Sequence, residues 1–308
     1  MEKRKIGSST LESSLIGLGC MSLGTEEKKA REIIEAALES GITYFDTADL
    51  YDFGVNEKIV GNALKKVRND VVIASKVGNR WKNQKDGWTW DPSKSYITEQ
   101  VKSSLKRLQV DYIDLYQLHG GTLDDPIDET IEAFETLKEQ GYIKEYGISS
   151  IRPNVIKEYA ERSQIASNMM QYSLLDRRPE EQAFPILEKH NVSVMTRGPL
   201  AKGMLTEKTF EKASESIKKD GYLYYSYESL KETLYSLLER FKEDRTMNEL
   251  ALKFNAANPI VGSIITGASS PEQVKSNVRA VSGDPLSKEE YELLKALTNG
   301  RGYSVHRI

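Results

Sequence analysis

Four titratable residues stand at or just after the ends of short apolar segments. Asp46 lies in TYFDT, Tyr51 follows it by five residues, Lys76 lies in VVIASKV, and His119 ends YIDLYQLH. A lysine among apolar residues loses hydration energy unless a partner compensates for it, and Asp46 could hold it charged and oriented. A neighbouring ammonium group stabilises tyrosinate, so Lys76 is expected to lower the pKa of Tyr51 from its reference value of about 10.

These residue types suit the reduction of a carbonyl group. Hydride addition creates an alkoxide that needs a proton, which Tyr51 could deliver, and His119 could donate a hydrogen bond to the carbonyl oxygen. Each residue also has a plainer interpretation: Asp46 as a turn acceptor, Tyr51 as loop packing, and His119 as a core histidine with its hydrogen bonds satisfied. The plainer interpretations would all have to be true at once, at adjacent strand ends. A shared role in carbonyl reduction is therefore favoured.

The segments that carry these residues belong to a regular alternation. Short apolar segments bounded by Gly, Asp, Asn and Ser predict buried strands at residues 15–18, 43–47, 71–77, 112–119, 145–149, 168–172, 192–197 and 263–266. Between them, helical spacing of apolar residues predicts helices at 27–39, 56–66, 96–108, 129–139, 154–161, 180–189, within 229–258 and at 271–281. Gly41, Gly141 and Asn191 are typical of helix C-termini, and Pro271 suits a first helical turn.

Eight strand-then-helix units predict an α/β fold of the (β/α)8 TIM-barrel type rather than an open sheet. Residues 3–6 and 11–13 flank Gly7-Ser8-Ser9-Thr10 and predict an N-terminal β-hairpin. No linker divides the chain, so we expect a single domain over residues 1–308 with extra C-terminal helices. Two insertions, 78–92 and 205–228, follow strand C-termini, which is the face where barrel enzymes place their chemistry.

Composition narrows the class of protein. The net charge is −3, from 43 basic and 46 acidic residues, so no excess of positive charge favours nucleic acid or a membrane surface. The single cysteine, Cys20, excludes an internal disulfide framework, and the three histidines are too far apart to suggest a metal site. Neither a secretory signal nor an apolar segment long enough to span a bilayer is recognisable, so we expect a cytoplasmic protein.

The sequence resembles the aldo-keto reductase superfamily from about Arg4 to Lys295. The tetrad Asp46, Tyr51, Lys76 and His119 matches the family's Asp, Tyr, Lys and His in order and context. The segments DTADLY, ASKVG, DYIDLYQLHG, YGISS, QYSLL, GPLAKGMLT and GASSPEQVKSN also resemble family motifs. The resemblance implies an enzyme that reduces a small carbonyl compound with NADPH on a barrel without a Rossmann fold. It implies nothing about oligomeric state.

The resemblance also implies a cofactor site across the barrel mouth. Residues expected near the nicotinamide are Gly19, Cys20, Met21 and Asp46, with Ser149, Ser150 and Gln171 on its carboxamide. Residues expected along the pyrophosphate are Pro199, Leu200, Ala201, Gly203 and Lys208, with Gly198 also expected at the cofactor and Arg197 at the nicotinamide. Residues expected on the adenosine 2′-phosphate and adenine are Gly267, Ser269, Gln273 and Asn277. For the last group a physical argument agrees, because GASS precedes a helix and helix N-termini bind phosphate; a plain N-cap is the alternative.

Several positions depart from the family pattern. Arg197 replaces the aromatic residue that usually stacks on nicotinamide, and Ser150 replaces an asparagine. Gly267 and Gln273 stand where many members have basic residues for the 2′-phosphate, and Ser276 replaces an acidic residue near the adenine. An arginine can stack on a ring through its planar guanidinium group. It could instead point away and pair with a carboxylate at the rim.

Other interpretations remain at this stage. A nonenzymatic NADPH-binding regulatory subunit is one, because the resembling family includes channel-associated β subunits. A glycoside hydrolase needs two facing carboxylic acids, whereas the fourth and seventh strands end in His119 and Arg197. A Rossmann fingerprint fits poorly, since the third glycine of Gly17, Gly19 and Gly24 is two positions late. The tryptophans of the first insertion could wall a substrate pocket or simply pack the loop: Trp81, Trp88 and Trp90. The tyrosines of the second could form a lip or simply cover the barrel: Tyr222, Tyr224, Tyr225 and Tyr227.

Overall fold

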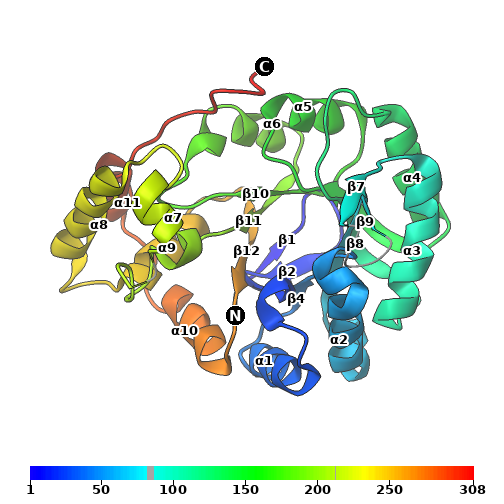
Figure 1. Cartoon of the computed structure of the whole chain (residues 1–308), viewed down its shortest axis with the longest axis horizontal. Helices are drawn as coiled ribbons and strands as arrows, with labels where there is room; N and C mark the ends of the chain where they lie inside the picture. Colours follow the sequence, from blue (N-terminus) through cyan, green and yellow to red (C-terminus); the bar gives the residue numbers. More distant parts are fainter. Residues whose placement is uncertain (82–86, 212) are drawn as a thin grey trace.

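The computed structural model describes residues 1–81, 87–211 and 213–308, and its centre is a closed barrel of parallel strands (Figure 1). The described residues form eight barrel strands, in the order β10-β11-β12-β3-β4-β5-β8-β9. Their bounds are β3 Ile16–Gly19, β4 Tyr44–Asp46, β5 Val72–Val77, β8 Ile113–Leu118, β9 Ile143–Ile148, β10 Ser167–Gln171, β11 Ser193–Arg197 and β12 Val261–Gly267. The expected (β/α)8 barrel is confirmed, with each predicted strand shifted by at most a few residues.

Helices surround the barrel (Figure 1). In α1 the buried residues Ala30, Ile33, Ile34 and Ala37 recur at helical spacing. The left-handed backbone of Gly41 follows this helix, as the sequence predicts. The helices are α1 Glu27–Glu39, α2 Val55–Leu64, α3 Lys94–Leu108, α4 Ile127–Glu139, α5 Pro153–Arg162, α6 Ala183–Lys189, α7 Glu215–Asp220, α8 Tyr227–Phe241, α9 Met247–Ala256, α10 Pro271–Val281 and α11 Lys288–Leu297.

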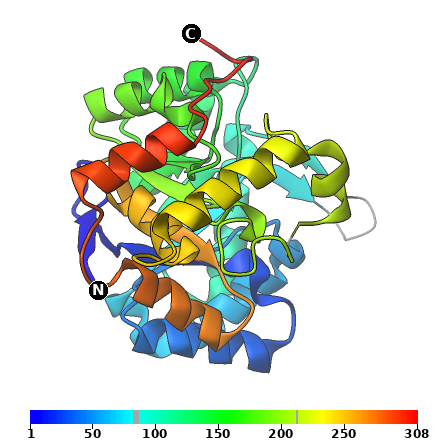
Figure 2. The ribbon, with the colours of Figure 1, turned by 90° about the vertical axis from the view of Figure 1, so that its left-hand side faces the viewer.

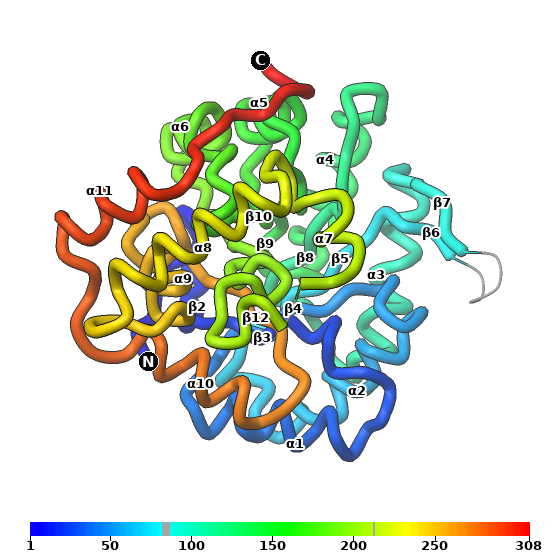
Figure 3. Tube along the Cα trace, turned by 60° about the vertical axis from the view of Figure 1, so that its left-hand side comes forward, coloured from blue at the N-terminus to red at the C-terminus, as the bar shows by residue number. Residues whose placement is uncertain are grey.

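The additions to the barrel were predicted only in part. The N-terminal hairpin of β1 Lys3–Lys5 and β2 Glu12–Ser14 is confirmed. A second antiparallel ribbon, β6 Asn79–Trp81 with β7 Trp88–Trp90, was not predicted and projects from the body in Figure 3. Part of the predicted insertion 78–92, residues 82–86, lies outside the described residues. The expected extra C-terminal helical structure is present as α11, which runs beside α8 (Figure 2).

Apolar packing occurs on both sides of the barrel wall. A smaller cluster inside the barrel includes Tyr44, Leu115, Met169 and Met195, all buried. A larger cluster fills the space between the strands and the helices. Side chains alternate along a strand, so every second residue points into the barrel. Toward the C-terminal ends of the strands, the residues that point inward are polar, among them Asp46 and Lys76. The barrel core therefore supports a polar site at its mouth. No helix of the described chain is long and apolar enough to cross a membrane.

Candidate active site

The three neighbouring strands β4, β5 and β8 bring the predicted tetrad together. Lys76 Nζ lies 2.8 and 2.7 Å from the two carboxylate oxygens of Asp46 and also donates to the Thr47 carbonyl at 2.9 Å. The same nitrogen lies 3.3 Å from the Tyr51 hydroxyl. Both Asp46 and Lys76 are buried. Although burial acts to lower the pKa of Lys76, Asp46 and Tyr51 together raise it above its ordinary value, so the lysine stays charged.

His119 follows β8 and lies against the ring of Tyr51. Its ring centroid lies 5.9 Å from that of Tyr51, edge to face, and its backbone N–H bonds the Val77 carbonyl. Burial lowers the pKa of His119 to about 3, with the positive charges of Lys76 and Arg197 adding to the effect. The imidazole is therefore neutral at physiological pH and can donate one ring N–H. Its Nδ1 atom is buried without a partner in the described part of the chain.

The pKa of Tyr51 corrects one expectation. Burial raises the pKa of Tyr51 above its ordinary value, and the opposing charge of Lys76 does not overcome that effect. Desolvation disfavours any buried tyrosinate, and it outweighs the effect that a neighbouring lysine alone would have. In the ligand-free protein Tyr51 is therefore a neutral phenol, the form that can donate a proton.

The loop that carries Tyr51 is held tightly. Thr47 donates a 2.7 Å hydrogen bond to Asn56, whose amide bonds the Cys20 carbonyl. Immediately after Tyr51 the chain turns through Asp52 and Phe53, both in the left-handed region at φ 48° and 52°. Such backbone is costly for residues other than glycine and persists only where the surroundings impose it.

On the opposite side of the mouth, Gln171 and Arg197 end β10 and β11 and are paired in register. Arg197 donates to Gln171 Oε1 at 3.2 Å, and Gln171 Nε2 donates to the Tyr222 hydroxyl at 3.3 Å. Within residues 1–81, 87–211 and 213–308, no carboxylate forms an ion pair with Arg197, so the alternative of a rim ion pair is not what the structure shows. Arg197 is exposed, and its charge lowers the pKa of His119.

The other residues expected at the cofactor lie along the rim but differ in accessibility. The side chains of Cys20 and Ala201 are fully buried, so these residues could meet a cofactor only through their backbone. Asn277 is also buried, accepting a bond from Asn248. Ser150 is buried, and its backbone N–H and carbonyl both bond the Asn168 amide. Exposed or half-buried positions are Gly19, Met21, Ser149, Gly198, Leu200, Gly203, Lys208, Gly267, Ser269 and Gln273, and Pro199 is buried.

Polar groups gather at the N-terminus of α10. Gln273 Oε1 accepts bonds from the N–H and hydroxyl of Ser269, and Ser270 caps the Gln273 N–H. Ser269 and Gln273 are exposed and Ser270 is half-buried at the start of this 11-residue helix, where backbone N–H groups favour an anion.

The aromatic residues of the two insertions lie in different parts of the structure. Trp90 lies against Gly78 and Gly120, which follow Val77 and His119, and its ring N–H bonds Asp125 at 2.9 Å. Trp81 packs edge to face on Phe53, and Trp88 is exposed. Trp90 therefore lies beside the two glycines that follow β5 and His119. In the second insertion Tyr222 and Tyr225 are buried, with Tyr222 contacting Gln171, so these tyrosines cover the barrel on the Gln171 side.

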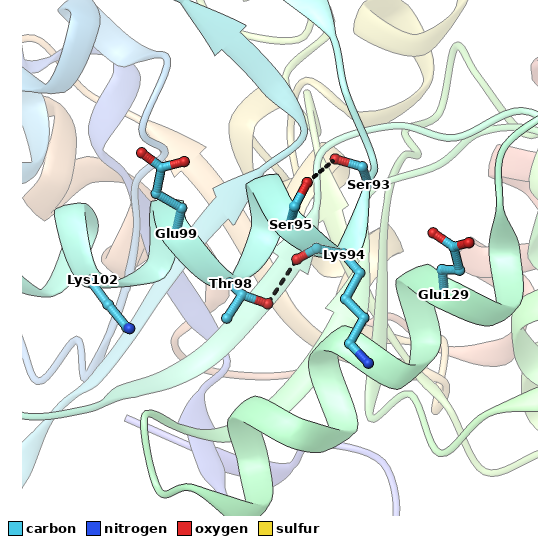
Figure 4. Close-up of a pocket in the computed structure, with 7 residues that line it drawn as sticks. All are labelled: Ser93, Lys94, Ser95, Thr98, Glu99, Lys102 and Glu129. Carbon is cyan, nitrogen blue, oxygen red and sulfur yellow. Dashed lines mark hydrogen bonds between the residues drawn. The ribbon is translucent and has the colours of Figure 1, made fainter.

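A separate depression of about 650 Å³ lies between α3 and α4 and is unrelated to the tetrad (Figure 4). It is lined by Ser93, Lys94, Ser95, Thr98, Glu99, Lys102 and Glu129. These side chains come from the N-terminal part of α3 and from α4, and none belongs to the residues predicted from the sequence. This depression therefore adds no residue to the candidate site at the barrel mouth.

Known proteins resemble the whole chain. The sequence model of the Aldo/keto reductase family matches residues 15–299. A relative named "Uncharacterized oxidoreductase YqkF" from Bacillus subtilis (strain 168) is 56% identical over 307 residues, covering 100% of both chains. The solved structure of aldo-keto reductase AKR11C1 from Bacillus halodurans (holo form) is 56% identical, covers 100% of both chains and has a TM-score of 0.94. A NADH-specific methylglyoxal reductase from Escherichia coli (strain K12) is 30% identical, covering 91% of this chain and 94% of its own.

Proposed function

Because this chain belongs to the Aldo/keto reductase family, we propose that it reduces an aldehyde or ketone to an alcohol with NADPH, and that Tyr51 donates the proton. One observation carries the proposal: the buried Lys76 ammonium, paired with Asp46, lies 3.3 Å from the Tyr51 hydroxyl. That contact stabilises the tyrosinate left after proton donation. An oxidoreductase of the family needs a positively charged group close to the oxygen on which negative charge develops.

Each tetrad residue then has one task. Bound NADPH would supply the hydride. Tyr51, protonated at rest because of its burial, gives its proton to the developing alkoxide, and Lys76 stabilises the resulting tyrosinate until solvent reprotonates it. His119 is neutral and offers a ring N–H to the carbonyl oxygen. Asp46 keeps Lys76 charged and fixes its direction through both carboxylate oxygens.

The residues at the mouth fit a nicotinamide cofactor. Gln171 presents an amide at the end of β10, Ser149 lies half-buried beside it on β9's exit, and the α10 N-terminus offers Ser269, Ser270 and backbone N–H groups for a phosphate. We assign the 2′-phosphate of NADPH to this helix N-terminus and the carboxamide to Gln171 and Ser149. NADPH must be tested against NADH, because the E. coli relative is NADH-specific and Gly267 and Gln273 bring no positive charge to a 2′-phosphate.

The test is oxidation of NADPH, followed by its absorbance, across aldehydes, ketones and quinones, with NADH in parallel. We expect turnover with at least one carbonyl class and a lower dissociation constant for NADPH than for NADH in fluorescence titrations. Equal dissociation constants would contradict the cofactor choice. Tight NADPH binding with no more than very slow turnover on every class would favour the regulatory role instead. Some relatives are named as channel subunits, including a probable voltage-gated potassium channel subunit beta from Arabidopsis thaliana, 29% identical.

A further inference from the structure

The loop between Asp46 and Tyr51 contains a second buried carboxyl group, that of Asp49, which the proposed reaction does not use. Asp49 is fully buried. Its Oδ2 atom accepts a 3.0 Å hydrogen bond from the side-chain amide of Gln100 on α3. In residues 1–81, 87–211 and 213–308, its Oδ1 atom has no hydrogen-bond partner. A buried carboxyl group whose partner is a neutral amide is unfavourable as an anion.

The neighbouring carboxyl group is paired very differently. Glu57 of α2 is also fully buried, but its Oε2 atom accepts a 2.6 Å bond from Arg107 Nε and its Oε1 atom a 2.6 Å bond from the Ser75 hydroxyl. Arg107 thus compensates the charge of Glu57 directly, while Asp49 faces the Gln100 amide. Of the two acids, Asp49 is the one that burial keeps protonated.

Asp49 sits at the start of a strained turn. Two residues after it comes Tyr51, and then Asp52 and Phe53 adopt the left-handed backbone. The far side of this turn is held because Gly54 lies directly against Arg107: a Cβ atom at Gly54 would lie 2.6 Å from Arg107 Cδ. The near side is held to the same helix, α3, by the contact of Asp49 with Gln100. Both ends of the turn are therefore tied to α3.

We propose that Asp49 is a positioning residue, whose carboxyl group, held by Gln100, fixes the loop that places Tyr51 against Lys76. The proposal rests on the proposed role of Tyr51 as proton donor. Its physical basis is that a strained turn keeps its shape only when its surroundings restrain it at both ends. The Asp49 backbone N–H, 3.5 Å from the Lys76 carbonyl, adds a second link between this loop and the tetrad.

The restraint depends on the charge of Asp49. The titratable or charged groups that face it are Glu57 on α2, Tyr96 and Arg107 on α3, and Tyr116 on β8. Burial, followed by the negative charge of Glu57, raises the pKa of Asp49 to about 8, whereas Arg107 acts in the opposite direction. Tyr96 and Tyr116 stay neutral, because burial and the acids raise their pKa values. Above about pH 8, a second buried anion beside Glu57 repels it and loosens the loop.

The experiment compares wild type with Asp49→Asn, which mimics the neutral acid, and with Gln100→Leu, which removes the partner. The control is Asp114→Asn, a buried carboxylate at the start of β8 that is ion-paired with Arg68 and Lys144. For each protein, kcat and the KM for NADPH are measured from about pH 6 to 9.5 at saturating carbonyl substrate, with circular dichroism as the check of folding.

We expect kcat of wild type to fall reversibly by about threefold or more above pH 8, and kcat of Asp49→Asn to stay level over the same range. Gln100→Leu should lower kcat about tenfold at pH 7 with the KM for NADPH unchanged. Asp114→Asn should keep the wild-type pH profile. A Gln100→Leu protein that does not fold is replaced by Gln100→Met.

Parallel kcat profiles in wild type and Asp49→Asn, or full activity in the folded Gln100 variant, would overturn the proposal. Tyr51→Phe in the same assay separates the role of Tyr51 as proton donor from the role of Asp49 as positioning residue. If that variant is inactive and the Asp49 and Gln100 variants behave as wild type, Tyr51 keeps its role and the Asp49 proposal fails. If Tyr51→Phe is active, the role of Tyr51 itself is wrong.

Discussion

The ammonium group of Lys76 lies 3.3 Å from the hydroxyl of Tyr51 in a part of the barrel mouth that is largely closed to water. The lysine comes from β5, whereas the tyrosine comes from the loop after β4. Because both strands end at the same face, their register sets this contact.

Removal of Lys76 should leave Asp46 as an uncompensated buried carboxyl group. We expect Lys76→Met to lower the free energy of unfolding at pH 7 by about 3–5 kcal/mol, the usual cost of breaking a buried pair. The double variant Asp46→Asn, Lys76→Met should recover part of that loss, because no charge then remains to be buried. Denaturant titration of the two proteins measures the difference. Equal stabilities would show that Lys76→Met does not leave a costly buried charge on Asp46.

Protonation of His119 should not limit activity between pH 5 and 7. Burial lowers its pKa in the folded protein to about 3, below the ordinary value of 6.5, so the folded state binds fewer protons than the unfolded state between these values. Its contribution to stability is therefore present above pH 6.5 and is lost as the pH falls toward 3. We expect kcat to be level from pH 5 to 7. A sharp acid limb near pH 6.5 that disappears in His119→Gln would contradict this assignment.

Asp49 should have the opposite effect on stability at alkaline pH. Its pKa of about 8 in the folded protein exceeds the ordinary value of 3.8, so its contribution to stability is present below pH 3.8 and is lost as the pH rises through 8. Asp49→Asn should therefore be more stable than wild type at pH 9, on the order of 1–3 kcal/mol, and equally stable at pH 4. Unfolding by urea at both pH values measures this. A variant less stable than wild type at pH 9 would show that Asp49 is a compensated carboxylate.

Arg197 should affect the oxidised and reduced cofactors differently. Its positive charge lowers the pKa of His119, and beside a bound cofactor it would disfavour the cationic oxidised nicotinamide relative to the neutral reduced one. We expect Arg197→Tyr to tighten NADP⁺ relative to NADPH and Arg197→Ala to weaken both. Tyr225→Phe in the insertion 205–228 serves as the control, because the hydroxyl that it removes accepts a bond from the Asn299 backbone N–H. Unchanged affinities for both forms in both Arg197 variants would show that Arg197 does not touch the cofactor.

Much of this architecture could be predicted from local patterns. The alternation of short apolar segments and amphipathic stretches is repeated eight times, and the described chain forms the barrel strands at those positions. The strand ends identified Asp46, Lys76 and His119 because parallel strands bring their C-termini to one face. The short helices and ribbons were harder. Helix α7 has six residues and the β6–β7 ribbon has three residues on each side, too few for periodicity to be recognised.

The groups that depend on packing could not be predicted in the same way. The raised pKa of Tyr51 comes from desolvation, which requires knowing what covers the residue. The contact of Arg197 with Gln171 requires the register of β10 and β11. Asp49 stands in the recognised segment DTADLY, but a carboxyl group three residues after Asp46 gives no sign that α3 will bury it against Gln100.

The central claim is that Tyr51 donates the proton in a reduction driven by NADPH. Its most direct test is Tyr51→Phe, which keeps the aromatic ring and removes the hydroxyl, assayed for carbonyl-dependent NADPH oxidation and for NADPH affinity. The account predicts a loss of kcat of at least about 10²-fold, with the dissociation constant of NADPH changed by no more than about threefold. A reduction rate in Tyr51→Phe close to that of wild type would contradict the account.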